Sequence, residues 1–176
     1  MLAGCPELVP ESVLAQARQL GDEHKWDEAR PFIKAYLLDH PEDVSGHFLL
    51  GRSYLGLAKP YLTQSIGELR MAETLTLADG ALGVFSDQSR EEFLSTIYQE
   101  IGRTHMRRVY EGINFGISPV QLKGFLEEAL ASVKRGLELQ PDSGFMKEME
   151  KTLLDLLVEV DGVEPEVSER RGRGVV

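Results

Sequence analysis

Apolar residues recur every three or four positions along most of the chain, the spacing that places them on one face of an α-helix. The alternation of apolar and polar residues that is typical of a half-buried β-strand is scarce. The pattern therefore predicts an all-α protein. Seven helices are expected, at about residues 10–21, 27–40, 44–58, 61–78, 89–110, 118–140 and 144–160.

Capping signals mark several of these boundaries. The segments 89–92 and 118–121 each combine a serine with a Glu or Gln three residues later, the spacing of a capping box at a helix N-terminus. Pro119 fits the second start, because a missing N–H costs little in the first helical turn. The ranges 80–87 and 111–117 lack the helical pattern, so both are predicted to be loops.

Comparison of the chain with itself reveals a repeated set of residues. The set has the offsets 0, +4, +7 and +12 and occurs as Ala29, Ile33, Tyr36 and Pro41, as Ser65, Leu69, Ala72 and Leu77, and as Ala129, Val133, Gly136 and Pro141. In the preceding helices, a small residue stands three positions before a larger one, as Ala17 and Leu20, Gly51 and Tyr54, and Gly102 and His105. The small residue lets the paired helix approach closely, and the larger one fills the seam between pairs.

This repeat resembles that of the tetratricopeptide repeat (TPR) family, with the best matches at residues 50–54 and from Trp26 to Pro41. The resemblance covers residues 10–141. It implies a right-handed α-solenoid of about three TPR-like helix pairs, followed by a C-terminal capping helix that covers the last apolar face. The expected pairs span about 10–41, 44–78 and 89–141, and the capping helix spans 144–160. Residues 1–9 are expected to be a frayed N-terminus, and residues 161–176 a disordered tail.

The composition narrows the choice of partner. The 176 residues carry 19 Lys and Arg against 29 Asp and Glu, and the formal net charge of −10 argues against nucleic acid as a partner. The single cysteine, Cys5, excludes an intramolecular disulfide and a multi-cysteine zinc site. No apolar run reaches the roughly 18 residues that a membrane span needs, so we expect a cytoplasmic protein.

The first residues leave one alternative localisation open. Leu2-Ala3-Gly4-Cys5 has the form of a bacterial lipobox, in which the cysteine is acylated after cleavage of a signal peptide. The apolar segment that such a signal needs is not present ahead of Cys5, so a frayed terminus is the expected interpretation unless the start has been truncated or misplaced. If the lipobox is used, the protein is a lipid-anchored bacterial TPR assembly factor.

No residue pattern indicates catalysis, a metal site or a cofactor site. The four histidines are scattered, and none has metal-ligand spacing to another His or Cys. Residues 112–116 contain glycines but lack the Lys and the strand-to-helix context of a phosphate-binding loop. Asp22, Glu23 and His24 are the group that an enzyme could use, but they fall in a predicted turn, where polar residues are expected. We therefore expect a protein that is not an enzyme and needs no cofactor.

The resemblance implies that the first helix of each pair lines a concave groove, in which peptides or partner helices bind. Arg18, Arg52 and Arg103 each follow the small residue of their repeat, so they are expected to form a row in this groove. The expected partner-binding residues are Leu14, Arg18, Phe48, Arg52, Arg103, Met106 and Arg107. Because Arg suits bidentate capture of carboxylates, the predicted partner is a protein or peptide segment that is acidic or bears a carboxylate.

The alternative is that these arginines only pair with neighbouring acids on a solvated surface. A departure from the family also limits the prediction. Some TPR proteins hold a terminal carboxylate with a Lys-Asn-Asn-Lys-Arg set, whereas the matching places here hold Leu14, Arg18, Arg52, Thr96 and Glu100. An adaptor for chaperone tails is therefore not favoured.

Overall fold

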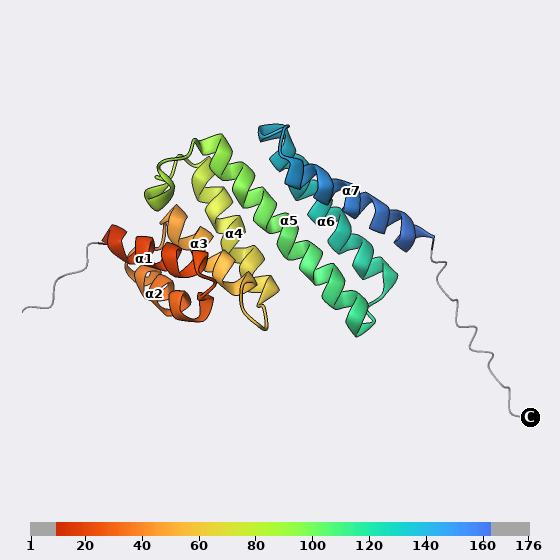
Figure 1. Ribbon diagram of the computed structural model, residues 1–176, viewed down its shortest axis with the longest axis horizontal. Coiled ribbons are helices and arrows are strands. Elements are labelled where there is room, and N and C mark those ends of the chain that lie inside the picture. Colours follow the sequence, from red (N-terminus) through yellow and green to blue (C-terminus); the bar gives the residue numbers. More distant parts are fainter. Residues whose placement is uncertain (1–9, 163–176) are drawn as a thin grey trace, which may run out of the picture.

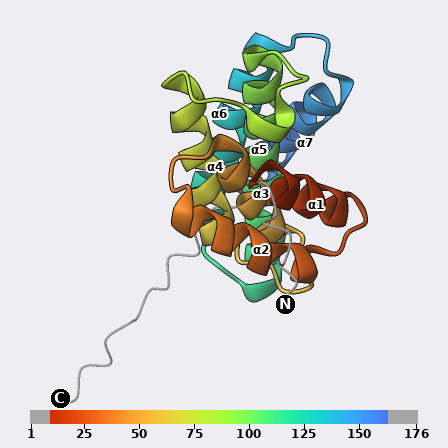
Figure 2. The same cartoon turned by 90° about the vertical axis from the view of Figure 1, so that its left-hand side faces the viewer.

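A computed structural model describes residues 10–162 of the chain. Within this range the protein forms seven α-helices and one short 3-10 helix, η1, and no strand (Figure 1). The elements are α1 (Pro10–Asp22), α2 (Trp26–Asp39), α3 (Val44–Leu55), α4 (Leu62–Leu77), η1 (Gly83–Phe85), α5 (Arg90–Phe115), α6 (Pro119–Leu139) and α7 (Gly144–Asp161). Consecutive helices pack together, so the molecule is a stack that runs from α1 and α2 at one end to α7 at the other (Figures 1 and 2). The expected all-α fold class is confirmed.

Both predicted capping boxes are present. Ser89 Oγ accepts a hydrogen bond from the Glu92 N–H at 3.2 Å, and the Glu92 carboxylate accepts one from the Ser89 N–H at 2.8 Å. Ser118 and Gln121 form the same reciprocal pair at the start of α6. These local signals fix the helix starts because each satisfies backbone N–H groups that have no partner within the helix.

The prediction of a loop at 111–117 is wrong for most of that range, because α5 continues to Phe115. Gly112 is buried within the helix, where a Cβ would overlap the side chain of Ile117. Gly116 then ends the helix in the left-handed conformation, with φ of 67°. The two glycines thus serve a close contact and a helix C-terminus, and α5 is overlong as a result.

The predicted break at 80–87 is confirmed, and it is packed against the rest of the molecule. η1 buries the ring of Phe85 against the rings of Phe48 and Phe93, whose centroids lie 5.2 and 5.0 Å from its own. The segment therefore belongs to the hydrophobic core, although its sequence has no helical pattern.

Two clusters of buried apolar residues run through the described part of the stack. The first takes its residues from α1 to α4, η1 and the first half of α5, and the second from the rest of α5, α6 and α7. α5 contributes to both, with Phe93 and Ile97 in the first cluster and Val109 in the second. This long helix is therefore the element that joins the two halves of the stack.

The small residues of the repeat lie where paired helices approach closely. A Cβ at Gly51 would be 2.7 Å from Leu69 Cγ on α4, and a Cβ at Gly102 would be 2.8 Å from Val133 Cγ2 on α6. Both distances are shorter than an ordinary carbon–carbon contact. The prediction that these glycines permit close packing of paired helices is confirmed at both positions.

The predictions about the chain ends fall largely outside the described residues. The expected frayed segment 1–9, with Cys5, and residues 163–176 of the expected tail lie outside them. α7 ends at Asp161, one residue after its predicted end. Between residues 10 and 162, none of the helices combines the length and the hydropathy that a membrane crossing requires.

Candidate functional site

A polar pocket of about 390 Å³ lies between α3 and α5, beside the turn that joins α1 to α2. Its lining includes Arg52 from α3 and Arg103 and Arg107 from α5. We call this cavity the arginine pocket. The structure therefore brings together three of the four arginines that the sequence analysis placed in the groove.

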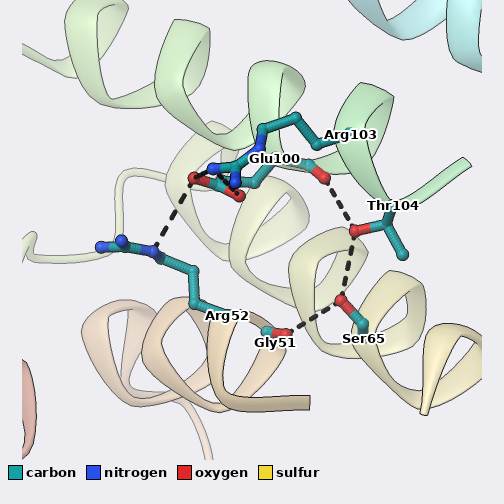
Figure 3. Close-up of polar contacts among 6 residues, drawn as sticks. All are labelled: Gly51, Arg52, Ser65, Glu100, Arg103 and Thr104. Atoms are coloured by element: carbon teal, nitrogen blue, oxygen red, sulfur yellow. Dashed lines mark hydrogen bonds and ion pairs between the residues drawn. The ribbon is translucent and has the colours of Figure 1, made fainter. Parts of the chain in front are cut away.

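A buried carboxylate organises the arginine pocket. Glu100 is only 4% exposed, and both of its carboxylate oxygens accept hydrogen bonds from Arg103 Nη1, at 3.0 and 3.2 Å (Figure 3). Arg52 Nε lies 3.7 Å from the same carboxylate. A buried charge is tolerated when it is paired, so Glu100 fixes the positions of two guanidinium groups from different helices. The sequence alone does not mark Glu100 as a site residue, because its role depends on contact with α3.

Buried hydroxyl groups lie behind the arginine pocket and join three helices. Ser65 Oγ on α4 donates to the Gly51 carbonyl on α3 at 2.9 Å, and Thr104 Oγ1 on α5 donates to the Glu100 carbonyl at 2.8 Å (Figure 3). The two hydroxyl oxygens are 3.3 Å apart. These contacts fix the register of α3, α4 and α5, and thereby place Arg52 beside Glu100.

The single tryptophan of the chain forms one wall of the arginine pocket. Trp26 is buried between two glycines, and a Cβ at either Gly21 or Gly56 would overlap its indole ring. The Arg52 guanidinium lies over this ring, 5.2 Å from its centroid, a cation–π arrangement. Trp26 therefore positions Arg52 from one side, while Glu100 positions it from the other.

The turn between α1 and α2 contributes His24 to the arginine pocket. His24 has φ of 60°, a left-handed conformation that is uncommon outside glycine. Its neighbour Glu23 accepts hydrogen bonds from Lys25 at 2.6 Å and Gln19 at 3.2 Å, and the bond from Lys25 holds the pKa of Glu23 below its usual range. Of the residues Asp22, Glu23 and His24, which an enzyme could use, His24 alone lines this pocket.

The structure separates Arg18 from the other groove arginines. Its guanidinium donates to the Val84 carbonyl at 2.6 Å and lies 4.6 Å from the ring centroid of Phe85. Asp87 is a weaker partner, at 3.9 Å. The segment that carries η1 therefore occupies the end of the expected arginine row, and the expectation that Arg18 shares one site with Arg52 is corrected. Arg18 holds this segment against α1.

Two of the expected apolar contacts are buried, which corrects the prediction that they face a partner. Leu14 and Phe48 are each 1% exposed and belong to the first core cluster. Phe48 is covered in part by Phe85 from η1. A sequence repeat places both residues beside the arginine row, but it does not show that a distant segment folds over them.

Met106 takes part in a separate, apolar pocket of about 170 Å³ between α5 and α7. The other apolar residues that line it are Phe145 and Met149 of α7. We call this cavity the methionine pocket. Arg107, the neighbour of Met106 in sequence, reaches the arginine pocket and also pairs with Glu111, at 3.1 Å.

His47 is held by contacts at both of its ring nitrogens. Both ring nitrogens of His47 face oxygens, with Nδ1 2.6 Å from Glu68 Oε2 and Nε2 2.9 Å from the Pro41 carbonyl. Burial acts to lower the pKa of His47, but the bond to Glu68, followed by the bond to Pro41, raises it above its usual value. His47 thus ties the start of α3 to α4 and to the preceding turn.

His105 lies on α5 and is only 3% exposed. Burial, and then the positive charges of Arg108 and Arg70, lower its pKa to about 4. Its Nδ1 lies 3.1 Å from Glu128 Oε2 but makes no hydrogen bond. Burial therefore dominates, and the ring is neutral at pH 7. Across the described range of the chain, no group of three or more His, Cys, Asp or Glu is arranged to hold a metal ion.

The arrangement of helices is shared with a solved structure. The chain is similar to the type III secretion translocator chaperone SycD of Yersinia enterocolitica, with a TM-score of 0.56 and 13% sequence identity over 92% of this chain and 89% of that chain. The fold is TPR-like. No family model matches the sequence, and no curated protein matches it. At this identity the likeness concerns the fold alone, and it agrees with the fold class that the repeat predicts.

Proposed function

We propose that this protein is a non-enzymatic, TPR-like interaction module whose arginine pocket binds a carboxylate-bearing segment of a protein partner. The observation that carries the proposal is the convergence of Arg52, Arg103 and Arg107 on one cavity. Glu100 is the acid that lines the same cavity, so the lining keeps an excess of positive charge on a chain of net charge −10. Such a site favours an acidic ligand over a neutral one.

The contacts of Glu100 leave donors for a ligand. Glu100 engages Nη1 of Arg103 and lies near Nε of Arg52, whereas each guanidinium carries five N–H donors. Because Glu100 and Trp26 already hold the two groups in place, a bound carboxylate need not order them. Preorganisation of this kind reduces the entropy that binding costs.

The fold supports the same class of function. The structurally similar SycD is described as a translocator chaperone, and a chaperone acts on another protein. Stacked helix pairs offer extended surfaces for such contacts. A role in protein binding is therefore proposed here for a chain that shares the architecture but not the sequence.

The test uses two synthetic peptides with a Gly/Ser background, one with two adjacent glutamates and one with glutamines in their place. Emission of Trp26, the single tryptophan, reports on occupancy because its ring forms a wall of the arginine pocket. The acidic peptide should change this emission in a saturable and salt-sensitive way, and the glutamine peptide should not. Equal responses to the two peptides would refute the proposal.

A matched pair of variants assigns the effect to the pocket. Arg107→Glu should strongly weaken binding of the acidic peptide while leaving the helical circular dichroism unchanged, because Arg107 lines the pocket without contacting the buried Glu100 and its side chain is about half exposed. Lys34→Glu alters the net charge by the same amount at an exposed position on α2 outside the pocket, and it should bind like the wild type. If both variants lose binding to the same extent, the overall charge and not the arginine pocket attracts the peptide.

A further inference from the structure

We infer that α7 belongs to the binding surface: the methionine pocket receives an apolar side chain of the same partner segment whose carboxylate enters the arginine pocket. This inference rests on the proposed function and specifies its ligand further. It also gives α7 a second role, because the repeat by itself predicts this helix only as a cap over the last apolar face.

The methionine pocket has the chemistry of a site for one apolar side chain. Met106, Phe145 and Met149 supply its apolar walls, and its volume of about 170 Å³ suits a side chain such as leucine, methionine or phenylalanine. Phe145 is 54% exposed, so the pocket keeps a large aromatic surface in water when it is empty. Methionine side chains adapt their shape to a ligand. Covering this surface would release the water that now contacts it.

Both pockets are lined in part by α5. Arg103, Met106 and Arg107 stand at positions i, i+3 and i+4 of α5, and such residues share one face of a helix. The arginine pocket lies on the side of this face toward α3, and the methionine pocket on the side toward α7. A ligand that crosses the exposed face of α5 therefore reaches both.

The width of α5 sets the spacing of the ligand's side chains. A helix with its side chains is about 10 Å wide. An extended chain advances about 3.3 Å per residue, so the acid and the apolar residue should be separated by about three residues. The expected occupant is thus an extended protein segment with an acidic side chain at one position and a large apolar side chain about three positions away.

The charge of the surroundings supports this choice of occupant. The arginine pocket carries an excess of positive charge, whereas the methionine pocket has a single charged residue, Glu148, among its lining. A purely acidic segment would leave the methionine pocket unfilled, and a purely apolar one would leave Arg52 and Arg103 without a partner acid beyond Glu100. A mixed segment satisfies both.

The experiment extends the peptide series by one residue type. Dye-labelled peptides with two glutamates, with or without a leucine three residues away on either side, are titrated against the full chain by fluorescence anisotropy. The leucine should tighten binding by about 10-fold, the gain expected for burying one such side chain. A leucine placed directly beside the glutamates should give a smaller gain.

Variants of α7 test whether the gain in affinity from the leucine comes from the methionine pocket. Phe145→Ser removes one wall of the methionine pocket, and Thr152→Phe fills the pocket without removing a wall. Both should bind the leucine peptide no better than the purely acidic peptide, with affinity for the acidic peptide unchanged. Leu154→Ser is the control, since Leu154 is similarly exposed (44%) on α7 but does not line the pocket. It should retain the full gain.

The outcomes separate this inference from the proposed function. If the wild type binds neither peptide, the proposed function fails. If it binds the acidic peptide but leucine adds nothing, or if the gain persists in both Phe145→Ser and Thr152→Phe, the inference about α7 alone is overturned.

Discussion

Replacement of Gly51 by leucine tests how closely α3 and α4 approach. A Cβ at this position would lie 2.7 Å from Leu69 Cγ and 3.1 Å from the Ser65 carbonyl oxygen. Leu69 is fully buried, and the carbonyl belongs to the backbone of α4, so neither atom can move away by a simple side-chain rotation. The two helices must therefore separate to admit the larger side chain.

The cost follows from three contributions. Overpacking of a closely packed core costs about 1–3 kcal/mol. Separation of the helices also weakens the buried bond from Ser65 to the Gly51 carbonyl, worth about 1 kcal/mol, while the better helix propensity of leucine returns about 0.5–1 kcal/mol. Gly51→Leu should thus lower the free energy of unfolding by about 1–3 kcal/mol. For a chain of this size the Tm should fall by roughly 3–10 °C.

Thermal and urea unfolding, followed by circular dichroism, measure this effect. Gly67→Leu is the matched control, because Gly67 lies on α4 and a Cβ there would meet no atom within 4 Å. This variant should be as stable as the wild type or slightly more stable. A melting curve of Gly51→Leu that coincides with the wild-type curve would show that α3 and α4 do not approach this closely.

Three further predictions concern stability and pH. As the pH falls from 7 to 5, His105 should lower the free energy of unfolding by about 2 kcal/mol, because its folded pKa of about 4 means that only the unfolded chain binds the extra proton. In urea unfolding at the two pH values, His105→Gln should therefore lose less stability than the wild type. His47 should act in the opposite sense, since its raised pKa stabilises the fold below about pH 6.5 and this contribution disappears as the pH rises through the folded pKa. The stability difference between wild type and His47→Gln should therefore shrink with rising pH, and a constant difference would contradict the proposed protonation. Gly21→Ala should overlap the Trp26 ring, lower the Tm and shift the tryptophan emission to the red, and an unchanged spectrum would show that the ring is not held there.

Local sequence signals predicted the framework of the fold well. The capping boxes at Ser89 and Ser118 act within a single helical turn, so their effect does not depend on the rest of the molecule. Gly51 and Gly102 were found through the repeat, whose spacing reflects the contact between paired helices. The end of α5 was missed, because Gly116 can serve either as part of a loop or as the cap of a longer helix.

The candidate site was predicted less completely, because it depends on contacts between distant segments. Arg52 and Arg103 were placed on one face by the repeat, but the buried acid between them, Glu100, has no distinguishing sequence pattern. Leu14 and Phe48 have the spacing of groove contacts and are nevertheless core residues. A segment without periodicity, which carries η1, lies over Phe48, and no local signal indicates where such a segment packs.

The length of α5 has a consequence for the dynamics of the whole stack. At 26 residues it forms a rod of about 39 Å that holds residues of both core clusters. Loss of either cluster would expose one end of this rod, so we expect the amides in its central turns to exchange hydrogen only when the entire domain opens. Both pockets lie on the same helix. A bound segment should therefore slow hydrogen exchange in both halves of the protein, at distances well beyond the residues it touches.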